Sequence, residues 1–144
     1  MYKFYGADRD LSDIRGKDIL PGITPFELYD ILSRIWCRYT CAPRLRDIWS
    51  EDDRTVGQCS ITAFLAQDIF GGEVRGIPRE GGSFHCFNVV DGKVFDLTSE
   101  QFHGEELVYE GCPIQQRDVH FVKTEKRERY DHLKDMLIKS TEER

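Results

Sequence analysis

The dipeptide Asp91-Gly92 constrains the fold more than any other feature of the sequence, because Asp-Gly is a strong signal for a two-residue β-hairpin turn. If Val90 pairs with Lys93 across this turn, the register of the two strands follows. His85 and Asp96 then project from the same face as diagonal neighbours, roughly 7–8 Å apart and within side-chain reach. The hairpin therefore predicts that a carboxylate holds an imidazole.

A His/Asp pair of this kind has two interpretations. In a catalytic group, the carboxylate orients the histidine, and the other ring nitrogen acts as the base for a nucleophile. In a structural role, the same cross-strand contact only stabilises the sheet. Both interpretations depend on the register, since a slip of one residue would send the two side chains to opposite faces.

Two helices are predicted before the hairpin. The first starts with a capping box at Thr24-Pro25-Phe26-Glu27, and its apolar stripe should end near residues 39–43. The second covers residues 59–70 and is closed by Gly71-Gly72. This second helix is apolar enough to be central.

The remaining segments predict a small sheet and a terminal helix. Four short runs of β-forming residues lie between polar or glycine-rich breaks: 73–77, 84–90, 93–98 and 119–123. From about residue 125, charged residues flank a thin apolar stripe, which predicts a helix lying on the domain. Residues 1–20 and the connection 43–57, anchored by Trp49, should be irregular. We therefore expect a single α+β domain over residues 1–144, with a central helix packed on a small antiparallel sheet.

Composition narrows the functional classes. The net charge of −6 and the pI of about 5.2 disfavour a nucleic acid or an anionic membrane as partner. No apolar run reaches membrane-spanning length, and the N-terminus lacks the apolar core of a secretion signal, so we expect a cytoplasmic protein. The five cysteines cannot all pair and should be free thiols. Cys37 and Cys41 have three residues between them, whereas the common zinc knuckle has two, and no matching second pair follows, so we expect no metal. We expect no cofactor either.

Cys59 is the candidate nucleophile. It follows Gly57-Gln58 at the start of the predicted central helix, where free backbone amides and the helix dipole favour a thiolate. The alternative is a buried structural cysteine, because cysteine is among the most buried residue types. Gly81-Gly82 precedes the strand that carries His85, and it can either let a substrate approach the base or form an ordinary loop.

Three short motifs carry a resemblance to known proteins: Gly57-Gln58-Cys59, Phe84-His85-Cys86-Phe87-Asn88 and Phe95-Asp96-Leu97-Thr98. Their order and composition resemble the transglutaminase-like branch of the papain superfamily. Residues 57–102 are also similar to the YunG-like family of small uncharacterised bacterial proteins. The chain departs from transglutaminases at Ser60, where tryptophan is usual, and at Cys86-Phe87, where Val-Trp is usual. Protein crosslinking is therefore not expected.

The resemblance implies a papain/transglutaminase-like fold and a cysteine hydrolase or acyltransferase. Cys59 would be the nucleophile, His85 the base and Asp96 the orienting carboxylate, acting on an amide, thioester or ester of a small molecule or peptide. The Cys59 amide, with Gln58 or Trp49, is a candidate for oxyanion binding.

Further candidates surround the predicted triad. Thr98 and Gln101 are candidates for supporting Asp96, although each of these side chains can instead satisfy local backbone. His103 is the replacement base if the hairpin is wrong.

Two other functions fit the same sequence. The fold can serve as a binding module without turnover, and a related fold uses the same triad to transfer acetyl groups from coenzyme A to amines. Selective reactivity of Cys59 would favour an enzyme over a binding module. The pattern names neither the substrate nor the oligomeric state.

Overall fold

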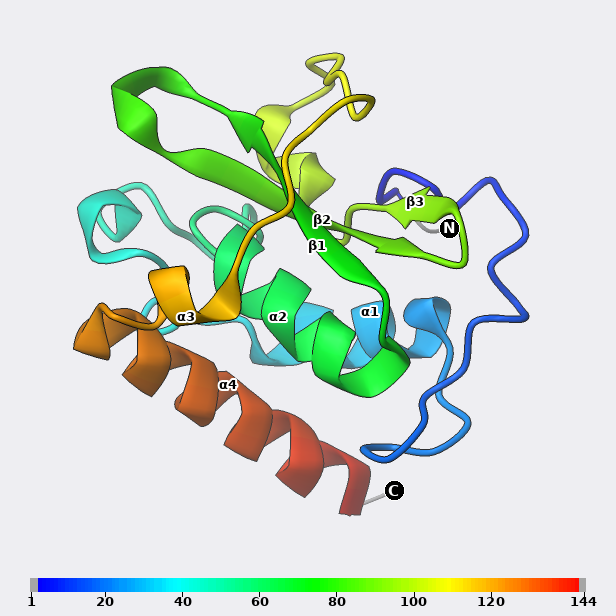
Figure 1. Cartoon of the computed structure of the whole chain (residues 1–144). Helices are drawn as coiled ribbons and strands as arrows, with labels where there is room; N and C mark the ends of the chain where they lie inside the picture. Colours follow the sequence, from blue (N-terminus) through cyan, green and yellow to red (C-terminus); the bar gives the residue numbers. More distant parts are fainter. Residues whose placement is uncertain (1–2, 143–144) are drawn as a thin grey trace.

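The helical and extended patterns form an α+β structure in which a three-stranded antiparallel sheet packs against helices (Figure 1). The computed structural model describes residues 3–142. Its elements, in chain order, are α1 (Pro25–Ile35), η1 (Pro43–Leu45), α2 (Cys59–Phe70), β1 (Glu73–Pro78), η2 (Glu80–Gly82), β2 (Phe84–Val90), β3 (Lys93–Phe95), η3 (Ser99–Phe102), α3 (Arg117–His120) and α4 (Thr124–Glu142). The predicted α+β class is confirmed.

Helix α1 begins at the predicted capping box but ends earlier than expected. The Thr24 hydroxyl accepts a hydrogen bond from the Glu27 amide, and the Glu27 carboxylate accepts one from the Thr24 amide. The helix was expected to reach residues 39–43, and it ends at Ile35 because Trp36 leaves the helical conformation at ψ 130°. The Trp36 indole instead donates to the Thr62 hydroxyl of α2 at 2.9 Å. A buried polar contact therefore ends the helix against its propensity.

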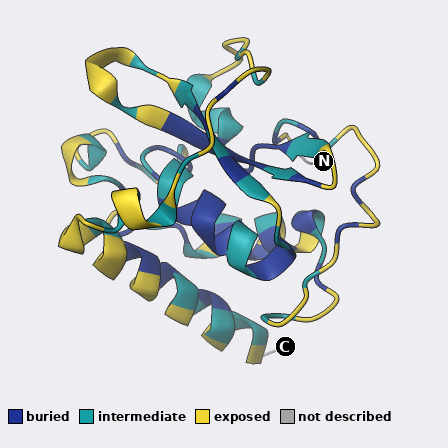
Figure 2. Ribbon diagram, viewed as in Figure 1, coloured by how far each residue is buried: buried dark blue, intermediate teal, exposed yellow. Residues whose placement is uncertain are grey.

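Helix α2 is the centre of the structure. Eight of its residues are buried, so most of the helix surface packs against other elements of the fold (Figure 2). It contacts β1 and β2 on one side and α4 on the other. Gly71 adopts φ 82° directly after the last helical residue, which confirms the predicted stop.

The sheet has the order β1-β2-β3, and the hairpin has the predicted register: Val90 pairs with Lys93, and Asn88 pairs with Phe95. The third strand is shorter than the predicted 93–98. The Asp96 amide donates to the Tyr5 carbonyl at 3.0 Å, so the chain leaves β2 at this point and pairs with the N-terminal segment. The Tyr5 amide in turn donates to the Ser99 hydroxyl at 2.8 Å.

The predicted strand at 119–123 is wrong. These residues form α3 and the turn that follows it, with Val119 and Val122 exposed. Arg117 ties the segment to α2 through an ion pair with Asp68 at 2.6 Å. Phe121 packs on Phe64 of α2 and on Tyr130 of α4. Short apolar runs fit a strand or a helix equally well, and tertiary contacts decide here.

The charge-dense C-terminal segment forms α4, as predicted, and lies along α1 and α2. Tyr130, Leu133 and Leu137 are buried on one side, whereas the opposite side faces solvent (Figure 2). The connection 43–57 contains the turn η1 and is anchored by Trp49, which packs with Cys41 and Val56 in a small cluster of its own. Between residues 3 and 142, no helix is long and apolar enough to cross a membrane.

Candidate functional site

Cys59 is the first residue of α2. Gln58 is the N-cap, and its side chain makes no capping hydrogen bond, so the amides of the first turn stay directed out of the helix end. Gly57 adopts φ 70°, and a Cβ there would lie 2.5 Å from the Cys41 sulfur and 2.8 Å from the Ala42 nitrogen. Only glycine allows this approach, which sets the position from which the helix and Cys59 start.

His85 and Asp96 are in contact. His85 Nε2 lies 2.6 Å from Asp96 Oδ2, and both side chains are almost completely buried. The Asp96 carboxylate also accepts hydrogen bonds from the Tyr109 hydroxyl at 2.8 Å and from the Thr98 amide at 3.2 Å. Phe102 stands edge-on to the imidazole, with the ring centroids 4.6 Å apart. These contacts leave the imidazole a single orientation.

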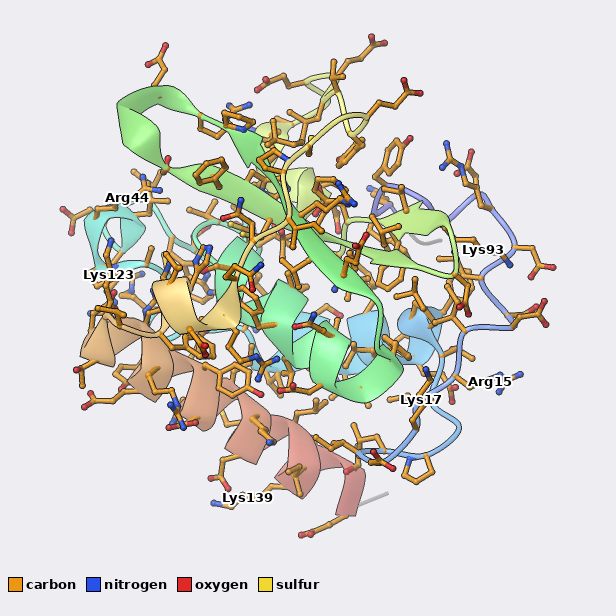
Figure 3. The ribbon with its side chains drawn as sticks, in the orientation of Figure 1. Arg15, Lys17, Arg44, Lys93, Lys123 and Lys139 are labelled. Atoms are coloured by element: carbon orange, nitrogen blue, oxygen red, sulfur yellow. The ribbon has the colours of Figure 1, made fainter. Side chains whose placement is uncertain are left out.

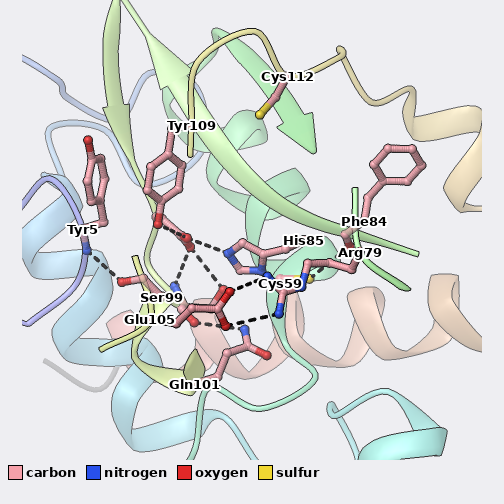
Figure 4. Close-up of polar contacts among 12 residues, drawn as sticks. Tyr5, Cys59, Arg79, Phe84, His85, Ser99, Gln101, Glu105, Tyr109 and Cys112 are labelled. Carbon is pink, nitrogen blue, oxygen red and sulfur yellow. Dashed lines mark hydrogen bonds and ion pairs between the residues drawn. The ribbon is translucent and has the colours of Figure 1, made fainter. Parts of the chain in front are cut away.

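The orientation of His85 leaves Nδ1 available to interact with Cys59. Nδ1 is buried and has no conventional hydrogen-bond partner among residues 3–142, while Nε2 is occupied by Asp96. The side chains of Cys59 and His85 lie next to each other (Figure 4) and interact electrostatically. The order of groups is therefore carboxylate, imidazole, thiol, with Nδ1 directed at the sulfur.

The electrostatics of the site favour an ion pair. Hydrogen bonding from the Cys86 side chain and then interaction with His85 hold the pKa of Cys59 well below its ordinary value, although burial opposes this. Burial lowers the pKa of His85, but Asp96 and Cys59 outweigh it and raise the value to about 10. The site therefore favours a thiolate facing an imidazolium at neutral pH.

The thiol and the imidazole open on a cavity of about 1040 Å³. Cys59 is half-buried, so the cavity gives reagents access to the sulfur. Phe84, Phe102 and Gly82 line one part of the wall. Arg79 forms an ion pair with Glu105 at 3.0 Å and lies over the Phe102 ring. A cavity of this size can hold a small molecule or a short peptide segment.

Two of the supporting residues expected from the sequence lie at the site. Thr98 donates to Asp96 through its amide, and its hydroxyl is 3.4 Å from the same oxygen. Gln101 lines the cavity, and its side-chain amide donates to the Thr98 carbonyl at 3.0 Å. The Gln101 side-chain oxygen also accepts from the Gly57 amide at 3.4 Å. Gln101 therefore links the loop before Cys59 to the loop after Asp96.

Two of the three candidates for oxyanion binding, the side chains of Trp49 and Gln58, are engaged in other contacts. The Trp49 indole N–H already donates to the Arg54 carbonyl at 3.0 Å, and Trp49 is not part of the cavity wall, so its predicted role is corrected. The Gln58 side chain is fully buried and donates to the Cys37 carbonyl at 3.1 Å. His103, the replacement base, is exposed and pairs with Asp53 at 2.9 Å.

Three residues at the site were missing from the sequence analysis. Tyr109 comes from a loop without a secondary-structure pattern and reaches Asp96 only in the folded chain. Phe102 covers the imidazole from the turn η3. Lys126 lines the cavity from the first turn of α4. No local signal marks these residues, because long-range packing creates each contact.

The described residues contain no group of three or more His, Cys, Asp or Glu side chains arranged to hold a metal ion. Cys37, Cys41, Cys59, Cys86 and Cys112 are free thiols.

Comparison with known proteins identifies the family. The family model described as YunG protein matches residues 24–142. The chain is 35% identical over 105 residues to a Bacillus subtilis (strain 168) protein named "Uncharacterized protein YunG", and the match covers 73% of this chain and 84% of that protein. No solved structure matches the chain. Because the family match extends from before α1 to the end of α4, the chain belongs to the YunG protein family.

Proposed function

We propose that this chain is a cysteine hydrolase or acyltransferase on a papain/transglutaminase-like fold. Cys59 is the nucleophile, His85 the acid and base, and Asp96 the group that orients His85. The observation that carries the proposal is the position of His85: one ring nitrogen contacts a buried carboxylate, and the other is directed at a thiol that opens on a cavity. This is the arrangement that nucleophilic catalysis by cysteine requires.

In the proposed reaction, the Cys59 thiolate attacks the carbonyl carbon of an amide, ester or thioester. The carbonyl electrons move to oxygen, and amides of the first turn of α2 can donate to this oxyanion. When the tetrahedral intermediate collapses, the leaving group takes the proton from His85 Nδ1, and an acyl thioester remains on Cys59. His85 then accepts a proton from water or an amine as this nucleophile attacks the thioester, which releases the acyl group and restores the thiolate.

Asp96 keeps the imidazole in the orientation that this cycle needs. Because Nε2 stays bound to the carboxylate, Nδ1 is the nitrogen that gives and takes the proton. Tyr109 and Thr98 saturate the remaining acceptor positions of Asp96, which prevents the carboxylate from turning away. The Phe102 ring packs edge-on against the imidazole and helps to keep the His85–Asp96 contact buried, while the sulfur stays open to the cavity.

Alkylation tests the nucleophile. Iodoacetamide should label Cys59 at least about tenfold faster than Cys37 at pH 7, since a lowered thiol pKa increases the thiolate fraction. Peptide mapping by mass spectrometry gives the rate at each cysteine, and His85→Ala should slow only Cys59. Equal rates at the two cysteines, or no labelling of Cys59, would overturn the proposal.

A second measurement separates an enzyme from a binding module. With p-nitrophenyl acetate, the enzyme should release a burst of nitrophenol, carry an acetyl group on Cys59, and then turn over. Cys59→Ser removes the acetylated peptide and the burst. Fast alkylation without any acylation of Cys59 would leave the binding module as the function. An acetyl group that leaves only when an amine is added would indicate an acetyltransferase, for which coenzyme A thioesters are the next donors to test.

A further inference from the structure

Lys126 lies in the wall of the same cavity, in a contact that fixes its side chain. Its Nζ is 3.0 Å from His120 Nδ1, and His120 Nε2 is 2.9 Å from the Gln115 side-chain oxygen. An ammonium has only donors, so His120 Nδ1 must accept, and Nε2 must carry the proton that it donates to Gln115. Burial and the Lys126 charge lower the pKa of His120 to about 4, which agrees with a neutral ring.

Lys126 has no carboxylate partner between residues 3 and 142. Two of the acidic residues in the cavity wall are already paired: Glu125 with Arg129 at 2.8 Å, and Glu105 with Arg79 at 3.0 Å. Burial lowers the pKa of Lys126, while Cys86 and Cys59 oppose the shift. A half-buried ammonium without a paired anion is costly, and a bound anion would offset that cost.

The wider cavity wall also has an excess of positive charge. After the two ion pairs are set aside, Arg44, Lys123 and Lys126 remain, against Glu80 alone. Arg44 and Lys123 project on the same side of the molecule (Figure 3). The chain as a whole carries a net charge of −6, so this local excess is opposite in sign to the rest of the protein. Such a field attracts anions to the cavity.

Acylation of Cys59 would change the charge close to Lys126. In the free protein, the Cys59 thiolate supplies negative charge to both His85 and Lys126. When the sulfur becomes acylated, this charge disappears, and Lys126 loses its neighbour of opposite sign. An anionic group on the acyl chain would replace it.

We propose that the cavity selects substrates that carry an anionic group, such as a carboxylate, close to the reacting carbon, and that Lys126 binds this group. His120 is the positioning residue, because its Nδ1 holds the Lys126 side chain in place. This inference rests on the proposed function, since it assumes that Cys59 attacks a substrate in the cavity.

Two alkylating reagents that differ only in charge test the inference. Iodoacetate carries a carboxylate beside the reacting carbon, and iodoacetamide carries a neutral amide. The measured quantity is the ratio of their rates at Cys59, divided by the same ratio for glutathione. The same thiolate attacks both reagents and displaces iodide from each, so any change in the ionised fraction of Cys59 cancels in the ratio.

For the wild type, the iodoacetate-to-iodoacetamide rate ratio at Cys59 should be about tenfold or more above the same ratio for glutathione at low salt. This preference should decrease as salt is added. Lys126→Gln should lower the ratio by about tenfold, whereas Lys126→Arg should keep most of the preference. Lys139→Gln is the matched control, because it removes the same charge from the far end of α4, where Lys139 is exposed and pairs with Asp135.

The outcomes separate the two proposals. Slow iodoacetamide labelling of Cys59 would refute the nucleophile and with it both proposals. Fast iodoacetamide labelling with a wild-type ratio equal to that of glutathione would refute anion selection alone. A high ratio that Lys126→Gln leaves unchanged would refute the role of Lys126. Circular dichroism of each variant shows that a changed ratio does not come from unfolding.

Discussion

Asp96→Asn should uncouple the imidazole from the thiol while it preserves the shape of the buried site. The carboxylate and its hydrogen bond raise the pKa of His85 to about 10 against the effect of burial. Without that charge, we expect the pKa of His85 to fall to its ordinary value of about 6.5 or lower, because burial still disfavours the protonated ring. At pH 7.5 the imidazole would then be protonated in at most about a tenth of the molecules, instead of nearly all of them.

The expected loss of reactivity follows from this fraction. The interaction with the His85 imidazolium is one of those that lower the pKa of Cys59. When the imidazolium is lost, the pKa of Cys59 rises, and the fraction of Cys59 present as thiolate decreases. Iodoacetamide labelling of Cys59 at pH 7.5 should therefore be about tenfold slower in Asp96→Asn than in the wild type. Wild-type labelling should vary little between pH 6 and 9, whereas labelling of the variant should increase steadily with pH.

Peptide mapping over a pH series measures both effects, with Cys37 as the internal reference in every sample. His85→Gln cannot carry the charge and should give the same slow rate. In a folded Asp96→Asn variant, Cys59 could still be labelled at the wild-type rate at pH 7.5 with a flat pH profile. That result would show that Asp96 does not control the charge of His85.

Two further predictions concern stability. Because the pKa of His85 is raised in the fold, its contribution to the free energy of unfolding is complete below pH 6.5 and is lost as the pH rises through about 10. Because the pKa of Cys59 is lowered in the fold, its contribution is complete above pH 9 and is lost as the pH falls through the folded pKa. Where the two pH windows overlap below pH 9, the two slopes oppose each other, so urea unfolding should show a plateau there and a decrease in stability from pH 9 to about 10. A single steady slope across both ranges would contradict the ion pair. Leu133→Ala on α4, where Leu133 is 0% exposed, should cost about 2–5 kcal/mol in the same assay, against less than about 0.5 kcal/mol for the exposed Asp131→Ala.

The parts of the site that sequence reasoning found depend on local rules. The two-residue turn at Asp91-Gly92 sets the hairpin register from Val90–Lys93 to Asn88–Phe95. Asp96, the next residue, contacts His85 as predicted, although its backbone pairs with Tyr5 instead of β2. The glycine pair after α2 and the capping box before α1 act within a few residues of the chain, so they can be recognised without a structure. The α4 stripe was recognisable because its apolar period is helical.

The parts that sequence reasoning missed depend on distant partners. The third strand ends at Phe95 because the next amide pairs with Tyr5, which lies far away in sequence. Trp49 had a plausible indole donor, but the nearby Arg54 carbonyl accepts it. Lys126 looked like one more charge on a solvated helix, and only the fold places it beside the cavity. Local propensity contains no information about such contacts.

The support of Asp96 by Tyr5 has a consequence for the extent of the functional unit. The family match begins at residue 24, yet the Tyr5 carbonyl holds the Asp96 amide, and the Tyr5 ring stacks on Tyr109 with centroids 4.0 Å apart. A chain shortened to the matched span would keep every residue of the proposed triad and lose the N-terminal segment that contacts Asp96 and Tyr109. For this member, the region recognisable by sequence is smaller than the region on which the geometry of the site depends.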